Sequence, residues 1–279
     1  MKRILIFGVT GLLGSGLYEE FIFNKKFLTK GVSRKKNAHL LKSRLKNNLI
    51  YLDEINNYQK IKRIFNTFKP NAVINCVGTI KQSNSIYNKD VTIFSNSIFP
   101  HILSSLCLLY KARLVHFSTD CVFSGKKGNY KENDTLDADD FYGKTKIIGE
   151  INNPNSITFR TSIIGKELYK KESLLEWFLK KKKSINGFRY AYFSGLPVKE
   201  IYRVINKVIL KKKIHGIFHL SSKRINKYDL LKLFAQKFKK KIKIMKYKKF
   251  KIDRSLNSQK LFKTVNYKPK SWGELIKLL

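Results

Sequence analysis

A tyrosine and a lysine lie one helical turn apart in the stretch DFYGKTK, residues 140–146. On a helix, Tyr142 and Lys146 would share one face, where the ammonium would lower the pKa of the phenol and help it to act as a general acid. This spacing alone has little weight in a lysine-rich chain. Three further pairs share it, those that begin at Tyr58, Tyr228 and Tyr247.

Short apolar runs alternate with longer helical patterns through the first 160 residues. We expect strands at 2–8, 27–33, 48–52, 71–77, 113–119 and 156–162. We expect helices at 12–24, 55–68 and 93–110. This alternation predicts an α/β fold with a doubly wound, parallel, Rossmann-like sheet.

The pattern becomes less regular after about residue 165. Helices are expected at 173–183, 197–211 and 226–238, and strands at 216–222 and 241–247. We predict a dinucleotide-binding domain over residues 1–165. We predict that residues 166–279 form mostly a smaller α/β lobe that binds substrate, with some elements returning to the first domain. Such a lobe would cover the carboxyl edge of the sheet, where open α/β folds bind ligands.

The first predicted strand ends in GVTGLLGSG, which places glycines at positions 8, 11 and 14. Gly8 permits a tight turn, Gly11 lets a pyrophosphate approach the backbone, and Gly14 lets the helix pack on the strand. The free N–H groups of the new helix favour a phosphate. Because the motif closes a strand and opens a helix, it predicts a dinucleotide site that includes Thr10.

The type of dinucleotide is read at the end of the second strand, where an acidic residue would favour NADH. This chain has Ser33 and Arg34 there, followed by two lysines. A hydroxyl and a cation suit a 2′-phosphate, so we predict NADPH, with NADH as the alternative. The open alternative is that these are ordinary surface charges. Asp53, which closes the third strand, is predicted to accept a hydrogen bond from the adenine amino group.

Position distinguishes Tyr142 from the other three tyrosines. It follows a buried strand that ends in Ser118-Thr119-Asp120, and it opens a helix. The carboxyl end of that strand and the first turn of that helix should meet at the cofactor site. Tyr142 and Lys146 are therefore the predicted catalytic pair.

Four motifs together resemble the extended short-chain dehydrogenase/reductases. They are the glycine turn, STDCVFSG at 118–125, YGKTK at 142–146 and FRTS at 159–162. Within that family the chain is similar to dTDP-4-dehydrorhamnose reductases along its whole length, most specifically over residues 1–165. The resemblance implies that a nicotinamide hydride reduces the C4 ketone of a nucleotide-linked 6-deoxyhexose, for surface polysaccharide synthesis.

The resemblance also implies roles for particular residues. Tyr142 would donate the proton, Lys146 would favour the phenolate, both would contact the cofactor, and Thr119 would stabilise the developing oxyanion. Thr119 and Asp120 match substrate contacts. The matching cofactor positions are Gly8, Gly11, Leu12, Leu13, Asp53, Cys76, Val77 and Gly78.

Two departures from the family pattern leave the substrate open. Cys121 stands where the family commonly has tyrosine, and Ile163 where it has tryptophan. The alternatives are a nucleotide-sugar 4-epimerase or a UDP-sugar reductase of the same fold, or a non-catalytic regulatory homologue. We interpret Asn96 as structural rather than as the holder of a catalytic water. The expected diphosphate ligands are Lys81, Arg160 and Arg189.

The net charge of +39 comes from 48 lysines and 10 arginines, alongside 22 asparagines and 6 alanines. This bias suggests A/T-rich codons rather than a specific nucleic-acid surface. Three cysteines without close pairing predict reduced thiols and a cytoplasmic protein. We reject a signal peptide, expect no membrane span and no metal site, and leave a homodimer open.

Overall fold

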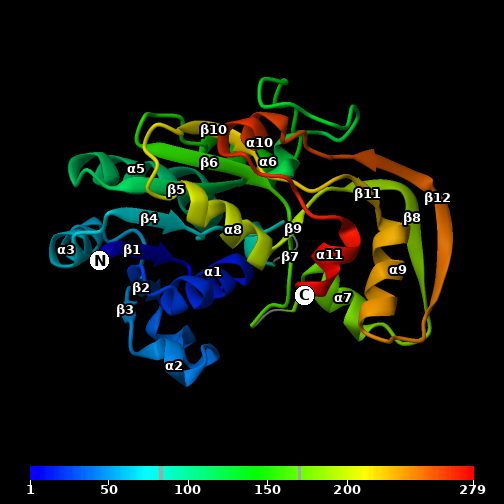
Figure 1. Cartoon of the computed structure of the whole chain (residues 1–279), viewed down its shortest axis with the longest axis horizontal. Coiled ribbons are helices and arrows are strands. Elements are labelled where there is room, and N and C mark those ends of the chain that lie inside the picture. Colours follow the sequence, from blue (N-terminus) through cyan, green and yellow to red (C-terminus); the bar gives the residue numbers. More distant parts are fainter. Residues whose placement is uncertain (82–83, 169–170) are drawn as a thin grey trace.

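The computed structural model describes residues 1–81, 84–168 and 171–279. Its larger sheet has seven strands, all parallel, in the order β10-β6-β5-β4-β1-β2-β3. These strands are β1 (Lys2–Phe7), β2 (Phe27–Ser33), β3 (Leu49–Tyr51), β4 (Ala72–Asn75), β5 (Arg113–Thr119), β6 (Ser156–Thr161) and β10 (Gly216–His219). The predicted α/β fold class is confirmed (Figure 1).

Helices cover both faces of this sheet, because alternate residues of β1 point to opposite sides. On one face Ile4 and Ile6 pack against α1 (Leu12–Phe23), α8 (Val198–Val208) and α10 (Gln259–Val265). On the other face Leu5 and Phe7 pack against α3 (Tyr58–Phe68) and α5 (Phe99–Leu109). The shorter helical elements include η1 (Lys35–Leu40), α2 (Ser43–Lys46), η2 (Asn84–Tyr87), η4 (Asp120–Val122) and α11 (Trp272–Lys277).

The helix expected at 93–110 starts earlier and is not uniform. It consists of α4 (Lys89–Ile93), the π-helical turn η3 (Phe94–Ile98) and α5. Among the described residues Lys89–Leu109 is the one stretch apolar and long enough to cross a membrane, and 56% of its most apolar window is buried in the protein. Leu103, Leu106 and Cys107 belong to the core, as in an ordinary core helix.

A second, three-stranded sheet lies at the far end of the molecule (Figure 1). It has the order β11-β8-β12, with β8 (Ser184–Phe193), β11 (Ile225–Asn226) and β12 (Lys243–Asp253). The helices α9 (Lys227–Lys237) and α7 (Leu174–Lys180) share its core. Between the sheets, β7 (Ile163–Ile164) pairs with β9 (Leu196–Pro197).

The segment after residue 165 both returns to the large sheet and forms the smaller one. The strand expected at 216–222 pairs with β6 in the large sheet, and α8 packs against α1. β8 was not expected as a strand. Its residues that face α9 include Gly187, Arg189 and Ala191, so the strand lacks an apolar alternation.

Candidate active site

The glycine turn joins β1 to α1 in the predicted geometry. Gly8 has a φ of +81°, which favours glycine, and it leaves no room for a side chain beside the backbone of Cys76. A Cβ at Gly14 would lie 2.1 Å from the carbonyl oxygen of Gly8. A Cβ at Gly11 would meet only that same oxygen, at 3.5 Å. The backbone at Gly11 is therefore open to a ligand, while Gly8 and Gly14 are needed by the fold.

Two alanine substitutions should separate these roles. Gly14→Ala should abolish or severely destabilise folding, because the 2.1 Å approach is to backbone that cannot move aside. Gly11→Ala should fold with a nearly unchanged Tm and lose affinity for NADPH. Thermal unfolding and fluorescence titration with NADPH measure both effects. Equal losses of stability in the two variants would contradict this account.

The end of β2 presents the residues expected to select the cofactor. Arg34 is exposed, and no described residue accepts a hydrogen bond from its guanidinium. Ser33 is buried, and its hydroxyl donates to the carbonyl of Arg34 at 3.0 Å. Asp53 is exposed, and its Oδ1 accepts from the backbone N–H of Lys35 at 2.7 Å. The three predicted residues thus gather at one edge, with the guanidinium free to bind a phosphate.

Residues 76–78 follow β4, and the backbone of Cys76 and Val77 lies beside Gly8. A Cβ at Gly8 would lie 2.9 Å from the backbone of Cys76, and burial raises the pKa of the Cys76 thiol. Asn96 lies behind Gly78 and is fully buried. Its amide accepts from the N–H of Thr79 at 2.9 Å and donates at 3.2 Å to Thr145 Oγ1 and to the carbonyl of Thr79. These bonds use both N–H groups and the oxygen of the amide, which supports the structural interpretation of Asn96.

Tyr142 lies in the first turn of α6 (Phe141–Ile148), where its phenol is near the side chain of Thr119 at the end of β5. Asp140 caps this helix, since its carboxylate accepts from the N–H of Gly143 at 2.8 Å. Burial raises the pKa of Tyr142, and the nearby Cys121 raises it further. The phenol is therefore protonated near neutral pH and can donate a proton.

Lys146 lies one turn further along α6 and is 6% exposed. Its Nζ donates to the carbonyl of Phe117 at 2.7 Å. Burial lowers the pKa of Lys146 to about 8, against the opposing charge of Glu150. The amine of Lys146 is held by the β5 backbone, and the rise in the pKa of Tyr142 comes mainly from burial; the effect of Lys146 on the phenol stays a prediction.

A buried ion pair lies behind the catalytic helix. Glu150, just after α6, accepts from Arg160 Nε at 2.8 Å and from its terminal nitrogen at 2.7 Å. The two side chains are 5% and 3% exposed. Ser118, the neighbour of Thr119, donates to the same carboxylate at 2.7 Å. The pair ties α6 to β5 and β6. The expectation that Arg160 holds a diphosphate is wrong, because its guanidinium is buried in this pair.

Two cations that the sequence did not reveal face this site from the smaller sheet. The guanidinium of Arg254 lies 3.7 Å from Cys121 Sγ. Its charge lowers the pKa of the Asp120 carboxylate and so opposes the effect of burial. Burial lowers the pKa of the Lys227 amine, at the start of α9, and the charges of Asp120 and Cys121 oppose this shift. Both follow Cys121 by more than a hundred residues, so no local pattern marks them.

Burial and nearby charges shift the pKa values of Asp120 and of its neighbour Cys121. Burial raises the pKa of Asp120, although Ser162 and Arg254 oppose it. Burial and the charge of Asp120 raise the pKa of Cys121 to about 12, so this thiol is neutral and poorly nucleophilic. Within the described residues no cluster of three or more His, Cys, Asp and Glu side chains could hold a metal ion.

The other two expected diphosphate ligands are already paired. Lys81 binds Asp140 at 2.7 Å beside Tyr142, and Arg189 binds Asp229 at 2.7 Å on α9. Lys81 is partly exposed at the edge of the site. It can therefore still reach a ligand there, whereas Arg189 is turned to α9.

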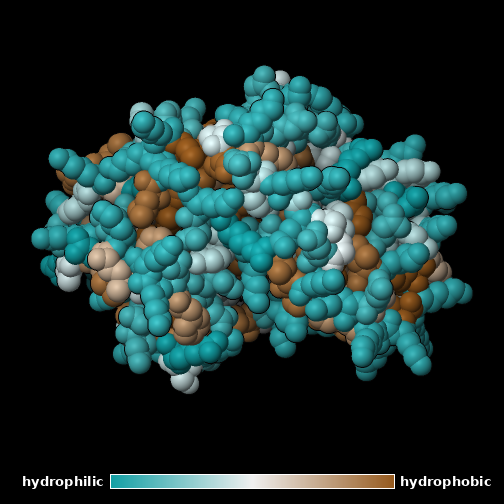
Figure 2. All heavy atoms as spheres, in the orientation of Figure 1, coloured by the Kyte–Doolittle hydropathy of each residue, from teal (hydrophilic) through white to brown (hydrophobic). Residues whose placement is uncertain are grey.

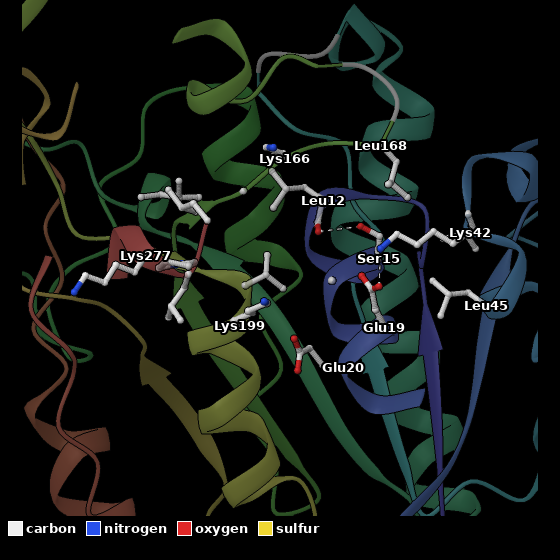
Figure 3. A pocket seen from close by; sticks show the side chains of 18 residues that line it. Leu12, Ser15, Glu19, Glu20, Lys42, Leu45, Lys166, Leu168, Lys199 and Lys277 are labelled. Carbon is white, nitrogen blue, oxygen red and sulfur yellow. Dashed lines mark hydrogen bonds and ion pairs between the residues drawn. The ribbon is translucent and has the colours of Figure 1, made fainter. Parts of the chain in front are cut away.

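A hollow of about 410 Å³ lies apart from these catalytic side chains, on the flank of α1 (Figure 3). Leu12, Ser15 and Glu19 line it from α1, and Lys42 pairs with Glu19 at 2.8 Å across it. Lys199 and Lys277 come from α8 and α11. Of the predicted site residues only Leu12 borders this hollow, so it is not the catalytic cleft.

The parallel sheet, the glycine turn at its first strand, Thr119 at the carboxyl end of β5, and Tyr142 and Lys146 on the neighbouring helix α6 define an extended short-chain dehydrogenase/reductase. The class predicted from the motifs is confirmed. More specifically, the chain belongs to the family of the RmlD substrate binding domain, which matches residues 1–277.

The curated relatives of this chain include proteins with two different names. Methionine adenosyltransferase 2 subunit beta of Xenopus laevis is 27% identical over 252 residues, covering 85% of this chain and 72% of the relative. dTDP-4-dehydrorhamnose reductase of Aggregatibacter actinomycetemcomitans is 25% identical over 236 residues, covering 79% and 74%. Among solved structures, dTDP-4-dehydrorhamnose reductase of Bacillus anthracis in complex with NADP has a TM-score of 0.82 at 21% identity, covering 99% of this chain and 98% of that one.

Proposed function

We propose that this protein is an NADPH-dependent reductase of the C4 ketone of a nucleotide-linked 4-keto-6-deoxyhexose. The observation that carries the proposal is the placement of Tyr142 and Lys146 on α6 beside the end of β5, where the amine of Lys146 donates to the carbonyl of Phe117 at 2.7 Å. A reduction needs a proton donor there, and both relatives named as reductases support this class of substrate. We place the reaction in the cytoplasm, in dTDP-rhamnose synthesis for surface polysaccharide.

The residues present fit a bound NADPH. The open backbone at Gly11 and the N–H groups that begin α1 would bind the pyrophosphate. The unpaired guanidinium of Arg34 would bind the 2′-phosphate, and Asp53 would contact the adenine. When bound, the dinucleotide supplies the hydride. The NADP in the Bacillus anthracis relative supports this cofactor.

The preference for NADPH should depend on Arg34. We expect Arg34→Ala to lower the ratio of kcat/KM for NADPH to that for NADH by about tenfold or more, because a charge-assisted phosphate contact is lost. Arg63→Ala, which removes an exposed arginine of α3, is the matched control. An unchanged ratio in Arg34→Ala would show that Arg34 is an ordinary surface charge.

The side chains of the site divide the reaction between them. Tyr142 donates its proton to the C4 oxygen as that oxygen gains charge, and Thr119 donates a hydrogen bond to the same oxygen. Lys146, charged below pH about 8, orients the nicotinamide ribose from its place beside β5. Asp120 contacts the sugar. Arg254 and Lys227 lie where they would bind the substrate diphosphate.

A second candidate function rests on the curated relatives named methionine adenosyltransferase 2 subunit beta. In that case the protein would bind a dinucleotide and regulate a partner without turnover. The retained Tyr142, Lys146 and Thr119 favour catalysis, since a site that binds only a cofactor does not require a proton donor. Binding of NADPH without oxidation of NADPH by any ketone would favour the regulatory function.

The test is NADPH oxidation by the purified protein with a panel of 4-keto nucleotide sugars. We expect turnover with dTDP-4-dehydro-6-deoxy-L-mannose and one NADPH consumed for each ketone. Turnover only with UDP-linked ketones would keep the mechanism and change the substrate. Interconversion of 4-epimers without net consumption of NADPH would instead identify a 4-epimerase.

A further inference from the structure

The smaller sheet has one covered face and one open face. α9 packs against the first face, where Gly187 leaves no room beside the ring of Tyr228 and Arg189 binds Asp229. β8 and β12 form the outer margin of the molecule on the side away from α9 (Figure 1). β12 is also an edge strand. The face turned away from α9 is therefore the open one.

Aromatic side chains gather on this open face. Phe188, Tyr190 and Tyr192 alternate along β8, so they point to one side with about 6.6 Å between neighbours. Tyr247 and Phe250 of β12 each place a ring 5.4 Å from the ring of Phe188. Tyr190 is 39% and Phe250 46% exposed. These five residues are called the aromatic face.

Cations frame the aromatic face. The Nζ of Lys251 lies 5.7 Å from the ring centre of Tyr190, and the guanidinium of Arg224 lies 4.6 Å from that of Tyr192. Two lysine runs, 180–183 and 239–241, meet where both strands begin. Their proximity follows from the bond that Lys240 Nζ donates to the carbonyl of Leu179 at 2.7 Å.

The charge of this lobe differs from that of the rest of the chain. Segments 177–199 and 230–252 contain sixteen of the 58 lysines and arginines and none of the 19 acidic residues. The acidic residues that flank the two segments are Glu176, Glu200, Asp229 and Asp253. Three of them are paired with arginines, Glu200 with Arg203, Asp229 with Arg189 and Asp253 with Arg224, so the two segments remain strongly positive. The viewed side of the molecule is mainly hydrophilic, with the apolar atoms in separate patches (Figure 2).

We propose that the aromatic face and its lysine runs bind single-stranded nucleic acid without base specificity. A row of aromatic rings on a sheet offers stacking to successive unpaired bases, as in sheet-based RNA-binding modules, while lysines track the phosphates. Duplex DNA buries its bases, and lipid headgroups have no aromatic surface to stack. The combination of rings and cations therefore favours a single strand over either of these polyanions.

The test is fluorescence anisotropy with a labelled mixed-sequence oligonucleotide of about 20 nucleotides, a length that spans at least one binding site. We expect the single strand to bind more tightly than a duplex of equal length, and binding to weaken as salt rises from about 50 to 200 mM. Saturating NADPH should not displace the oligonucleotide. Equal affinity for the duplex, displacement by NADPH, or binding only to phosphatidylserine vesicles would each overturn the proposal.

Two pairs of variants assign the binding to this face. Tyr190→Ala with Phe250→Ala should raise the Kd about tenfold or more, whereas Tyr58→Ala, on α3, should leave it unchanged. Both altered rings are partly exposed, and an unchanged Tm confirms the fold. An unchanged Kd in the double variant would overturn the role of the rings.

The second pair tests the charges. Lys248 and Lys249 lie in the bulge of β12. The double variant Lys248→Glu with Lys249→Glu should weaken binding and reduce its salt dependence. The matched control is Lys25→Glu with Lys26→Glu, an exposed pair between α1 and β2. Equal effects of the two charge pairs would show a diffuse attraction and overturn the proposed site.

Discussion

Replacing Tyr142 by phenylalanine should lower kcat by about 10²–10⁴-fold, with a far smaller change in the Kd for NADPH. The phenol is protonated near neutral pH because burial raises its pKa, and it lies near Thr119 at the carboxyl end of β5. The variant removes the proton donor and keeps the ring that fills the site. Stopped-flow NADPH oxidation measures the effect.

Tyr58→Phe is the matched control for that experiment. Tyr58 begins α3 and has Lys62 at the same spacing, but it lies on the surface at 43% exposure. We expect no change in kcat. If Tyr142→Phe retained most of the turnover, another group would have to supply the proton, and the assignment of Tyr142 would fail.

Replacing Glu150 by glutamine should destabilise the protein by about 3–5 kcal/mol, because Arg160 would keep a buried charge without a partner. Glu150→Leu combined with Arg160→Met should recover most of that loss. Asp134→Asn breaks the exposed pair with Lys127 and should cost less than about 1 kcal/mol. Urea denaturation measures all three. A small loss in Glu150→Gln would contradict the role of the buried pair.

Glu150→Gln should also shift the pH profile of kcat/KM. Lys146 has a pKa of about 8, so activity that needs its charge falls as the pH rises through 8. Glu150 raises that pKa, and its neutralisation should shift the alkaline limb to lower pH. The other groups that face Lys146 are Cys76 at the end of β4, whose pKa is raised, and His116 of β5, whose pKa burial lowers; both are neutral there. An unmoved limb would mean that Lys146 does not control the profile.

The parts of the fold that sequence alone predicted are those set by local pattern. The run Lys2–Phe7 followed by three glycines determines a strand, a turn and a helix within one short segment. Tyr142 was distinguished from Tyr58 by the buried strand that precedes it, and the structure places it beside Thr119. β8 escaped prediction because the middle of its inner face, Gly187, Arg189 and Ala191, is small or charged, so burial there depends on α9.

The parts that sequence could not predict are contacts between distant segments. Arg160 was expected to meet the substrate, and only the fold shows that Glu150 takes its guanidinium inside the protein. Arg254 and Lys227 reach Asp120 because β12 and α9 of the smaller sheet face the end of β5. Lys146 is held by the Phe117 carbonyl, a backbone partner that no side-chain pattern reports.

The most direct measurement of the central claim follows deuterium from [4-²H]NADPH into the hexose. With dTDP-4-dehydro-6-deoxy-L-mannose as substrate, we expect the wild-type protein to form a product that carries one deuterium at C4. We expect Tyr142→Phe to form no deuterated product on the time scale of a few wild-type turnovers. A protein that binds NADPH but transfers no deuterium to any 4-keto nucleotide sugar would contradict the reductase and favour the regulatory function.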